Sequence, residues 1–168
     1  MLEEGMASEP QLIVRRIGGV DLRAATELFT QQQRGYGRDV DVDRLRPALQ
    51  AALEDSDRVL VVGAFHEGLP GFAHGKLVGV LMMTVLISLE QMGEVGWIEQ
   101  LYVREDYRRK GLGDRLLATA VDWGAGRGLR AIDVEFGERH DAAAAQGLYG
   151  KKGFAQVQRT RLSKLMAG

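Results

Sequence analysis

Hydrophobic and polar positions follow two different periods along this chain, and these periods divide it into strands and helices. Five segments are continuously apolar or alternate with a period of two, as β-strands do: residues 11–17, 58–65, 76–88, 94–103 and 131–136. Four segments repeat apolar residues at helical spacing: residues 20–33, 42–54, 113–126 and 142–152. The tail from Phe154 to Met166 predicts one or two further strands.

Turn residues between these segments indicate how the strands pair. Short connections that contain glycine join the second, third and fourth strands, which favours antiparallel pairing. Pro47 is compatible with the second helix only if a helix begins or restarts there. We therefore expect a mixed α/β (α+β) fold, with a mostly antiparallel sheet of about six or seven strands and about four helices. Residues 1–10 are expected to be a flexible tail, and residues 11–168 a single domain.

Composition and charge narrow the classes of function. The 168 residues include 22 Lys and Arg, 23 Asp and Glu and no cysteine, which excludes disulfides and thiolate catalysis and gives no global sign of nucleic-acid binding. The N-terminal stretch MLEEGMASEP is acidic and lacks an apolar core, unlike a signal peptide. The longest apolar run, residues 77–89, is shorter than the ~20 residues of a membrane helix. We expect a cytoplasmic protein with neither a membrane nor a nucleic-acid partner.

The stretch VREDYRRKGLGDRLL, residues 103–117, carries the clearest chemical signal. Three cations precede Gly-Leu-Gly between a predicted strand and a predicted helix, where free N–H groups and the helix dipole attract anions. That combination suits a pyrophosphate. The Walker pattern is absent and Leu116 replaces the third glycine of GxGxxG, so ATP and NAD are not indicated. A plain helix entry with solvated cations, or a basic patch for nucleic acid, would also account for the motif alone.

Two motifs together resemble the GNAT superfamily of N-acetyltransferases. The family's acetyl-CoA loop, [QR]-x-x-G-x-[GA], is similar to the segment with Arg108, Gly111 and Gly113, which follows the strand IEQLYV. Its later Y-x-x-x-G-F element is similar to residues 149–154. The resemblance is specific over residues 97–154 and rests on element order before them. One departure is Ala142, where such proteins often carry Asn, with Asp141 as the neighbouring substitute.

The resemblance implies acetyl-CoA as cosubstrate, without a metal. It implies that the fourth and fifth strands splay apart, with the pantetheine arm between them and the pyrophosphate on the loop that opens the next helix. The implied cofactor-binding residues are Leu101, Tyr102, Val103, Arg108, Arg109, Lys110, Gly111, Leu112, Gly113 and Asp114.

Glu99 is the candidate catalytic base. A lysine-like amine of pKa ~10.4 is only about 0.04% neutral at pH 7, so transfer to an amine needs a base or a desolvated site. Strict alternation places Glu99 on one face with Val95, Trp97, Leu101 and Val103, and burial of that face would make its carboxylate a better base. An ion pair with an arginine, or a bulge that turns Glu99 outward, are the structural alternatives, and Glu135 is the reserve candidate.

Tyr149 is the second candidate catalytic residue, because the resemblance places it beside the departing sulfur, although a tyrosine near Leu148 and Phe154 also suits a core position. Acidic residues including Glu90, Glu94 and Glu138 could rim the acceptor mouth and favour a cationic substrate, or simply be solvated.

The resemblance implies direct acetyl transfer from acetyl-CoA to a primary amine, in a small molecule or a peptide. A non-catalytic acyl-CoA-binding module is the alternative, and a homodimer is left open.

Overall fold

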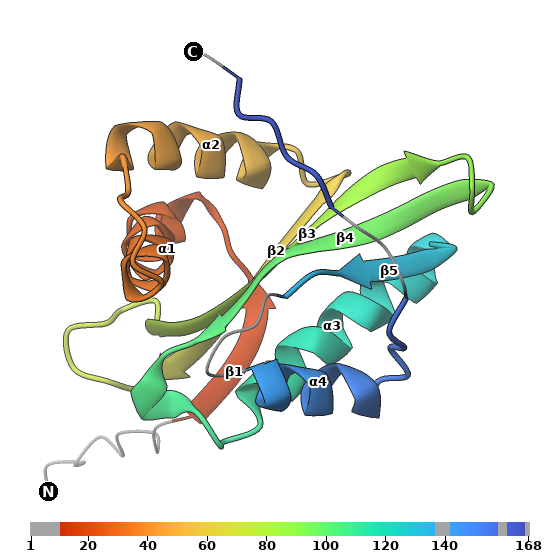
Figure 1. Cartoon of the computed structure of the whole chain (residues 1–168). Helices are drawn as coiled ribbons and strands as arrows, with labels where there is room; N and C mark the ends of the chain where they lie inside the picture. The colour runs from red at the N-terminus through yellow and green to blue at the C-terminus, as the bar shows by residue number, and fades with distance from the viewer. Residues whose placement is uncertain (1–10, 137–141, 158–160, 167–168) are drawn as a thin grey trace, which may run out of the picture. The chain divides into compact units, whose positions relative to one another are not determined.

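The structure is a computed structural model that describes residues 11–136, 142–157 and 161–166. Contacts divide the chain into two compact units, Met1–Glu135 and Phe136–Gly168. The first unit holds a five-stranded sheet in the order β1-β2-β3-β4-β5 (Figure 1). Its strands are β1 (Gln11–Arg16), β2 (Val59–Glu67), β3 (Lys76–Ser88), β4 (Gly93–Val103) and β5 (Ala131–Val134). Its helices are α1 (Leu22–Gly35), α2 (Val42–Glu54) and α3 (Leu112–Arg127), with short 3₁₀ turns at Gly19–Asp21 and Glu105–Tyr107.

The first four strands pair antiparallel with their sequence neighbours, and β5 joins β4 in parallel. The antiparallel pairing of β2, β3 and β4 confirms the prediction from their short connections. The parallel ladder is short, because β5 pairs only with Val95–Ile98 of β4. From Glu99 to Val103 the outer edge of β4 therefore has no strand beside it among the described residues, and this confirms the predicted splaying of these strands.

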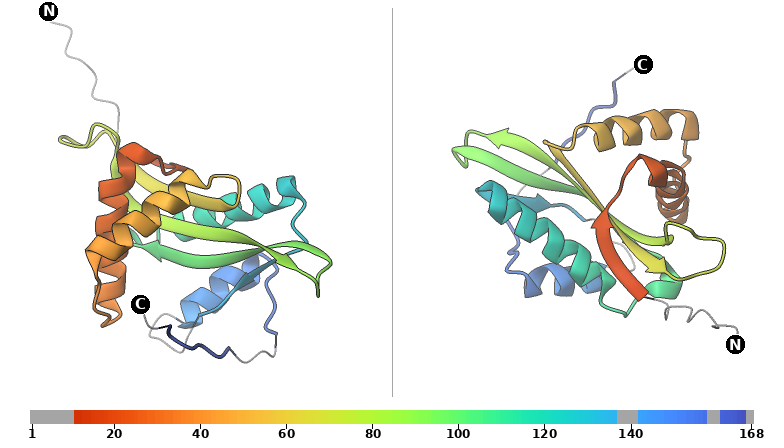
Figure 2. Two further views of the ribbon diagram at one scale, coloured as in Figure 1. Left: turned by 90° about the horizontal axis from the view of Figure 1, so that it is seen from above. Right: turned by 180° about the vertical axis from the view of Figure 1, so that it is seen from behind.

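Helices cover both faces of this sheet (Figure 2). On one face, Leu28 and Phe29 of α1 and Leu49 of α2 form a buried cluster with residues of β2 and β3, among them Val61 and Val80. On the other face, Leu116 of α3 packs closely over Gly79 of β3. A Cβ atom added at Gly79 would lie 3.3 Å from the Leu116 side chain. Each face of the sheet is thus covered by apolar helix residues.

Helix boundaries agree closely with the hydrophobic periodicity. Helix α2 begins after Asp41, whose carboxylate accepts hydrogen bonds from the N–H groups of Asp43 and Arg44. The expectation that Pro47 starts or restarts a helix is wrong, because Pro47 lies inside α2. Pro47 is exposed, so the carbonyl that loses its helical partner can be hydrated.

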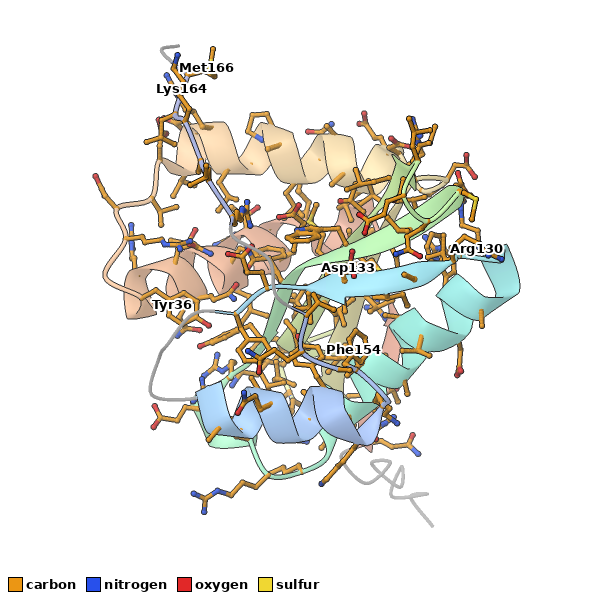
Figure 3. All side chains as sticks on the ribbon, turned by 45° about the vertical axis from the view of Figure 1, so that its right-hand side comes forward. Tyr36, Arg130, Asp133, Phe154, Lys164 and Met166 are labelled. Atoms are coloured by element: carbon orange, nitrogen blue, oxygen red, sulfur yellow. The ribbon has the colours of Figure 1, made fainter. Side chains whose placement is uncertain are left out.

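The second unit contains helix α4 (Ala142–Lys151) and the described part of the tail. Gly153 has φ +82° and closes the helix, as the sequence predicted. Phe154, labelled in Figure 3, follows this turn. The described tail residues, 154–157 and 161–166, form no strand. The sheet therefore has five strands in the described chain, and the prediction of six or seven is wrong in this detail.

Candidate active site

A bulge in β4 places Glu99 where β4 loses its parallel partner. Met82 of β3 lies opposite Gln100 and the next residue, Met83, lies opposite Ile98, so Glu99 has no partner in the ladder. The Glu99 side chain is exposed, and within the described residues it makes no ion pair with an arginine. The bulge alternative is therefore the one that the structure has.

This bulge overturns the predicted common face of β4. Before the bulge, Trp97 lies opposite Thr84, and after the bulge, Gln100 lies opposite Met82. Thr84 and Met82 are two residues apart on β3, so Trp97 and Gln100 lie on the same face of the sheet. Leu101 lies opposite Leu81, on the other face. The prediction of a buried face carrying Glu99 is wrong, because one extra residue reverses the alternation.

Backbone groups at the end of β4 are divided between β3 and the open edge. The N–H of Arg104 donates to the carbonyl of Val78 in β3, at 2.9 Å. Since successive residues of a strand direct their backbone groups to opposite sides, Tyr102 faces β3 while Leu101 and Val103 face the open edge. Arg108 supports this assignment, because its Nε donates to the carbonyl of Val103 at 3.0 Å.

The loop before α3 contains two left-handed residues. Arg109 has φ +61° and Gly111 has φ +73°. An arginine in this region carries strain of about 1 kcal/mol or more, whereas glycine carries none. Gly111 is the N-cap of α3 and supplies no side chain to its first N–H groups. A Cβ at Gly111 would meet no described atom within 4 Å, so the helix start is open.

The basic side chains of this loop lie at the surface. Arg108, Arg109 and Lys110 are exposed. Arg108 also lies over the Tyr102 ring, with Cζ 5.8 Å from its centroid, and the Lys110 Nζ lies 5.4 Å from the centroid of Tyr107. Three residues with full positive charges thus directly precede a helix start whose N-cap makes no side-chain hydrogen bond, which is favourable for a bound anion.

Tyr107 fixes the segment that leads into the loop. It is 9% exposed, and its hydroxyl lies 2.7 Å from Nδ1 of His66 in β2. This bond joins residues 41 positions apart. Sequence reasoning missed this pair, because a lone histidine in a strand has no characteristic spacing.

Tyr149 belongs to the second unit and lies in an aromatic cluster there. It is 6% exposed, stacks on Phe136 with ring centroids 5.7 Å apart, and meets Phe154 edge-on at 5.3 Å. The ring of Tyr149 therefore occupies a packed position, as the core alternative expected. A catalytic role for its hydroxyl stays a prediction.

Glu94 does not fit the predicted acidic rim. The Arg127 guanidinium donates two hydrogen bonds to its carboxylate, at 3.0 and 3.2 Å, and lowers the pKa of Glu94. Glu138 and Asp141 lie outside the described residues.

Among the residues described, no group of three or more His, Cys, Asp or Glu side chains is arranged to hold a metal ion.

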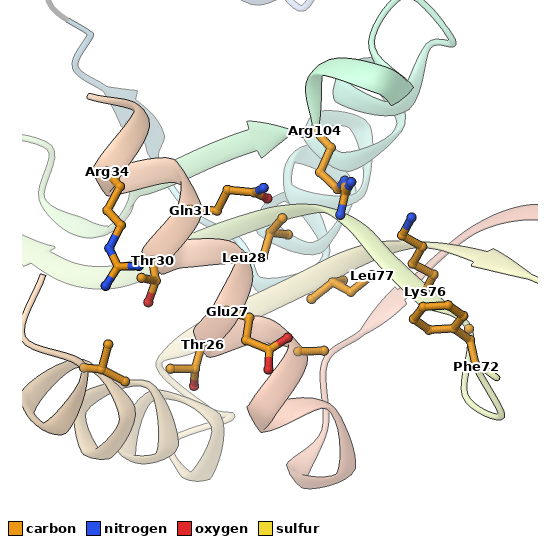
Figure 4. Close-up of a pocket in the computed structure, with 13 residues that line it drawn as sticks. Thr26, Glu27, Leu28, Thr30, Gln31, Arg34, Phe72, Lys76, Leu77 and Arg104 are labelled. Carbon is orange, nitrogen blue, oxygen red and sulfur yellow. The ribbon is translucent and has the colours of Figure 1, made fainter. Parts of the chain in front are cut away.

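An open cavity of about 650 Å³ runs along α1 in the first unit (Figure 4). Its walls come from α1, the first residue of α2, the connection before β3, the start of β3, and Arg104 directly after β4. No helix within the described ranges is both long and apolar enough to cross a membrane.

Comparison with known proteins identifies the family. Residues 22–154 match the sequence model of the acetyltransferase (GNAT) family, so the chain belongs to this family. An uncharacterized N-acetyltransferase of Bacillus subtilis (strain 168), YhfO, is 24% identical over 143 residues, covering 85% of this chain and 89% of the relative.

Two solved structures show the same fold. An integron cassette protein from the mobile metagenome of Cole Harbour Salt Marsh has a TM-score of 0.75 and 24% identity, over 92% of this chain and 91% of its own. The structure of AAC(6')-Iy in complex with the bisubstrate analog CoA-S-monomethyl-acetylneamine has a TM-score of 0.71 and 18% identity, over 94% and 99%.

Proposed function

We propose that this chain moves the acetyl group of acetyl-CoA directly to a primary amine, within a ternary complex. The observation that carries the proposal is the open, left-handed, cationic start of α3 beside the outer edge of β4 from Glu99 to Val103, where no described strand pairs with β4. One part suits a pyrophosphate, and the other offers backbone groups to an extended amide-containing arm. Membership of the acetyltransferase (GNAT) family supports acetyl-CoA as the molecule that combines both.

Each part of the cofactor has its own set of protein groups in this proposal. The open-edge backbone groups of Leu101 and Val103 bond to the pantetheine arm, and Tyr102 supports them from inside the ladder. The phosphates lie against the uncapped N–H groups of the α3 start and the loop cations. The phosphate-binding set is Arg108, Arg109, Lys110, Gly111, Leu112, Gly113 and Asp114.

The chemistry requires a neutral amine and a stabilised leaving group. Glu99 takes a proton from the acceptor ammonium, through a water molecule because the carboxylate is exposed. The amine nitrogen then forms a bond to the carbonyl carbon and the carbon–sulfur bond breaks. The second proton of the nitrogen passes through water to the coenzyme A thiolate, so the products are an N-acetyl amine and coenzyme A. Tyr149 donates a hydrogen bond to the departing sulfur. Full proton transfer from a phenol of pKa ~10 to a thiolate of pKa ~8.5 is uphill by about 2 kcal/mol.

A related fold supports an amine as the acceptor. AAC(6')-Iy was solved with an analog that joins CoA to an acetylated neamine. For this chain we propose only the shared chemical class, a primary amine, since a common fold leaves the substrate open.

Release of coenzyme A tests the proposal. The protein is incubated with acetyl-CoA and a panel of primary amines, and both the free thiol and the mass of each amine are followed. Thiol release that depends on the amine, with one acetyl group added to it, is expected. Tight acetyl-CoA binding without turnover on any amine would instead identify a non-catalytic acyl-CoA-binding module. Equal binding of ATP and acetyl-CoA would reject the assignment of the loop.

A further inference from the structure

The cavity along α1 carries an excess of positive charge. Among its lining residues, Arg34, Lys76 and Arg104 are cationic and Glu27 is the single anion. Glu27 is already paired with Arg23 one helical turn earlier, at 3.0 Å. Arg104 is likewise paired, with Asp106, so the excess of positive charge comes from Arg34 and Lys76, and it favours a negatively charged ligand.

Two of these cationic side chains, Lys76 and Arg104, make contacts with neighbouring side chains that restrict their motion. Lys76 lies beside two aromatic rings, with its Nζ 5.9 Å from the Phe72 centroid and 5.7 Å from that of Tyr107. Arg104 donates from Nε and Nη2 to Asp106, at 3.1 and 3.3 Å. In Figure 4 both heads are drawn above Leu77, and the carboxylate of Asp106 interacts electrostatically with both. Both side chains are half-buried, so less conformational entropy is lost when they bind an anion.

Thr30 gives an independent sign of a ligand. It lines the cavity, is 8% exposed, and its Oγ1 has no hydrogen-bond partner among the described residues. Other threonines in these helices bond back to the preceding turn: Thr26 donates to the carbonyl of Leu22 and Thr119 to that of Arg115. A buried hydroxyl without a partner carries a desolvation cost that a polar ligand would remove.

We propose that this cavity is the acceptor site and that it selects primary amines carrying an anionic group, a carboxylate or a phosphate. The inference rests on the proposed function, and it names the substrate class. The anionic group lies between Lys76 and Arg104. An acceptor whose only charge is its ammonium group, as an acidic rim would favour, is disfavoured here by like-charge repulsion. Arg104 directly follows β4, so the same segment borders the acceptor cavity and leads into the cofactor loop.

Matched amine pairs test this inference. 4-Aminobutyrate is compared with its amide, and ethanolamine phosphate with ethanolamine, so that each pair differs only in the anionic group. Calorimetry on the protein loaded with coenzyme A measures acceptor binding without turnover, and thiol release from acetyl-CoA measures transfer. The member with the anionic group is expected, in at least one pair, to bind about tenfold more tightly than its partner without that group, as one charge-assisted hydrogen bond provides.

Lys76→Met tests the site, because methionine keeps an unbranched side chain and removes the charge. It should abolish the preference for the anionic member while leaving acetyl-CoA affinity within about twofold. Arg46→Met is the matched control, since Arg46 is exposed on α2 and does not line the cavity; it should retain the full preference.

Equal binding of both members of each pair overturns the inference, even where acetyl transfer occurs. A parallel loss of acetyl-CoA affinity in Lys76→Met also overturns it, by assigning Lys76 to the cofactor. Selective binding of anionic amines without acetyl transfer upholds the subsite and rejects the proposed function.

Discussion

Two glutamates on β4 have opposite environments. Glu94 is tied to Arg127 near the start of the strand, whereas Glu99 stands exposed in the bulge with no ion pair among the described residues. The same side chain therefore stabilises the sheet at one position and is available for chemistry at the other. Position relative to the bulge decides whether the glutamate is paired or exposed.

Glu99→Gln is expected to lower turnover about 10²-fold near neutral pH, because it removes the base, while acetyl-CoA affinity and thermal stability remain those of the parent. Steady-state kinetics, calorimetry and thermal melting measure the three quantities. Glu94→Gln is the matched control: it breaks the pair with Arg127, so it should lower the melting temperature and leave turnover unchanged. Parental turnover in Glu99→Gln would remove Glu99 from the mechanism.

Tyr149→Phe separates the packing of the ring from the role of the hydroxyl. The ring keeps its contacts with Phe136 and Phe154, so the free energy of unfolding should fall by no more than about 1.5 kcal/mol. Turnover at saturating substrates should fall by roughly 10²–10⁴-fold if the hydroxyl stabilises the departing sulfur. Tyr107→Phe, which loses the hydrogen bond to His66, should reduce the free energy of unfolding and keep the turnover of the parent protein. Similar kinetics for both variants would return Tyr149 to a purely structural role.

At the scale of elements, helix α3 is flanked at both ends by a glycine in the left-handed conformation. Gly111 at its start has φ +73°, Gly128 at its end has φ +79°, and a Cβ at either would meet no described atom within 4 Å. The two ends thus impose the same backbone requirement. They differ in charge, because the start carries the partial positive charge of the helix and the loop cations.

Gly111→Ala and Gly128→Ala should each lower the free energy of unfolding by about 1 kcal/mol, since alanine is strained at positive φ. Only Gly111→Ala should also weaken acetyl-CoA binding, because its added methyl group stands where the cofactor approaches. Chemical denaturation and calorimetry on both variants measure this. Equal acetyl-CoA affinity in the two variants would place the cofactor elsewhere.

The junction of β1 and α1 depends on one buried carboxylate. Asp21 is 4% exposed; burial alone would raise its pKa, but hydrogen bonds from Arg15 and from the Gly18 N–H outweigh burial and lower the pKa. A lowered folded-state pKa adds stability above the unfolded value of about 3.9, and that stability is lost as the pH falls through the folded value.

Asp21→Asn should therefore lower the free energy of unfolding by about 2 kcal/mol at pH 7 and show a smaller further loss below pH 4 than the parent. Urea denaturation at several pH values measures both effects. Glu27→Gln removes only an exposed pair, so it should change stability by less than about 0.5 kcal/mol. A parallel pH dependence in the parent and Asp21→Asn would show that another carboxyl controls acid unfolding.

At the scale of the whole molecule, local periodicity predicts elements well and pairing irregularities poorly. The bounds of α2 and β3 match the prediction because apolar spacing and caps lie within each segment. The bulge at Glu99 depends on where β3 pairs, so alternation along β4 alone misses it. The left-handed Arg109 and the bond between His66 and Tyr107 likewise depend on distant partners or backbone geometry, which residue type does not reveal. The loop cations, by contrast, are visible in the sequence itself.

Those cations belong to a chain whose formal net charge is −1, so cofactor affinity should depend on where charge lies. Arg109→Glu combined with Lys110→Glu should weaken acetyl-CoA binding at least tenfold at low ionic strength, and salt should affect the remaining binding less than it affects the parent. Arg44→Glu combined with Arg46→Glu, on α2, changes the net charge by the same amount and should leave acetyl-CoA affinity nearly unchanged. Calorimetry over a range of salt concentrations compares the three proteins. Equal losses in both double variants would mean that overall charge governs binding, and that the loop holds no phosphate.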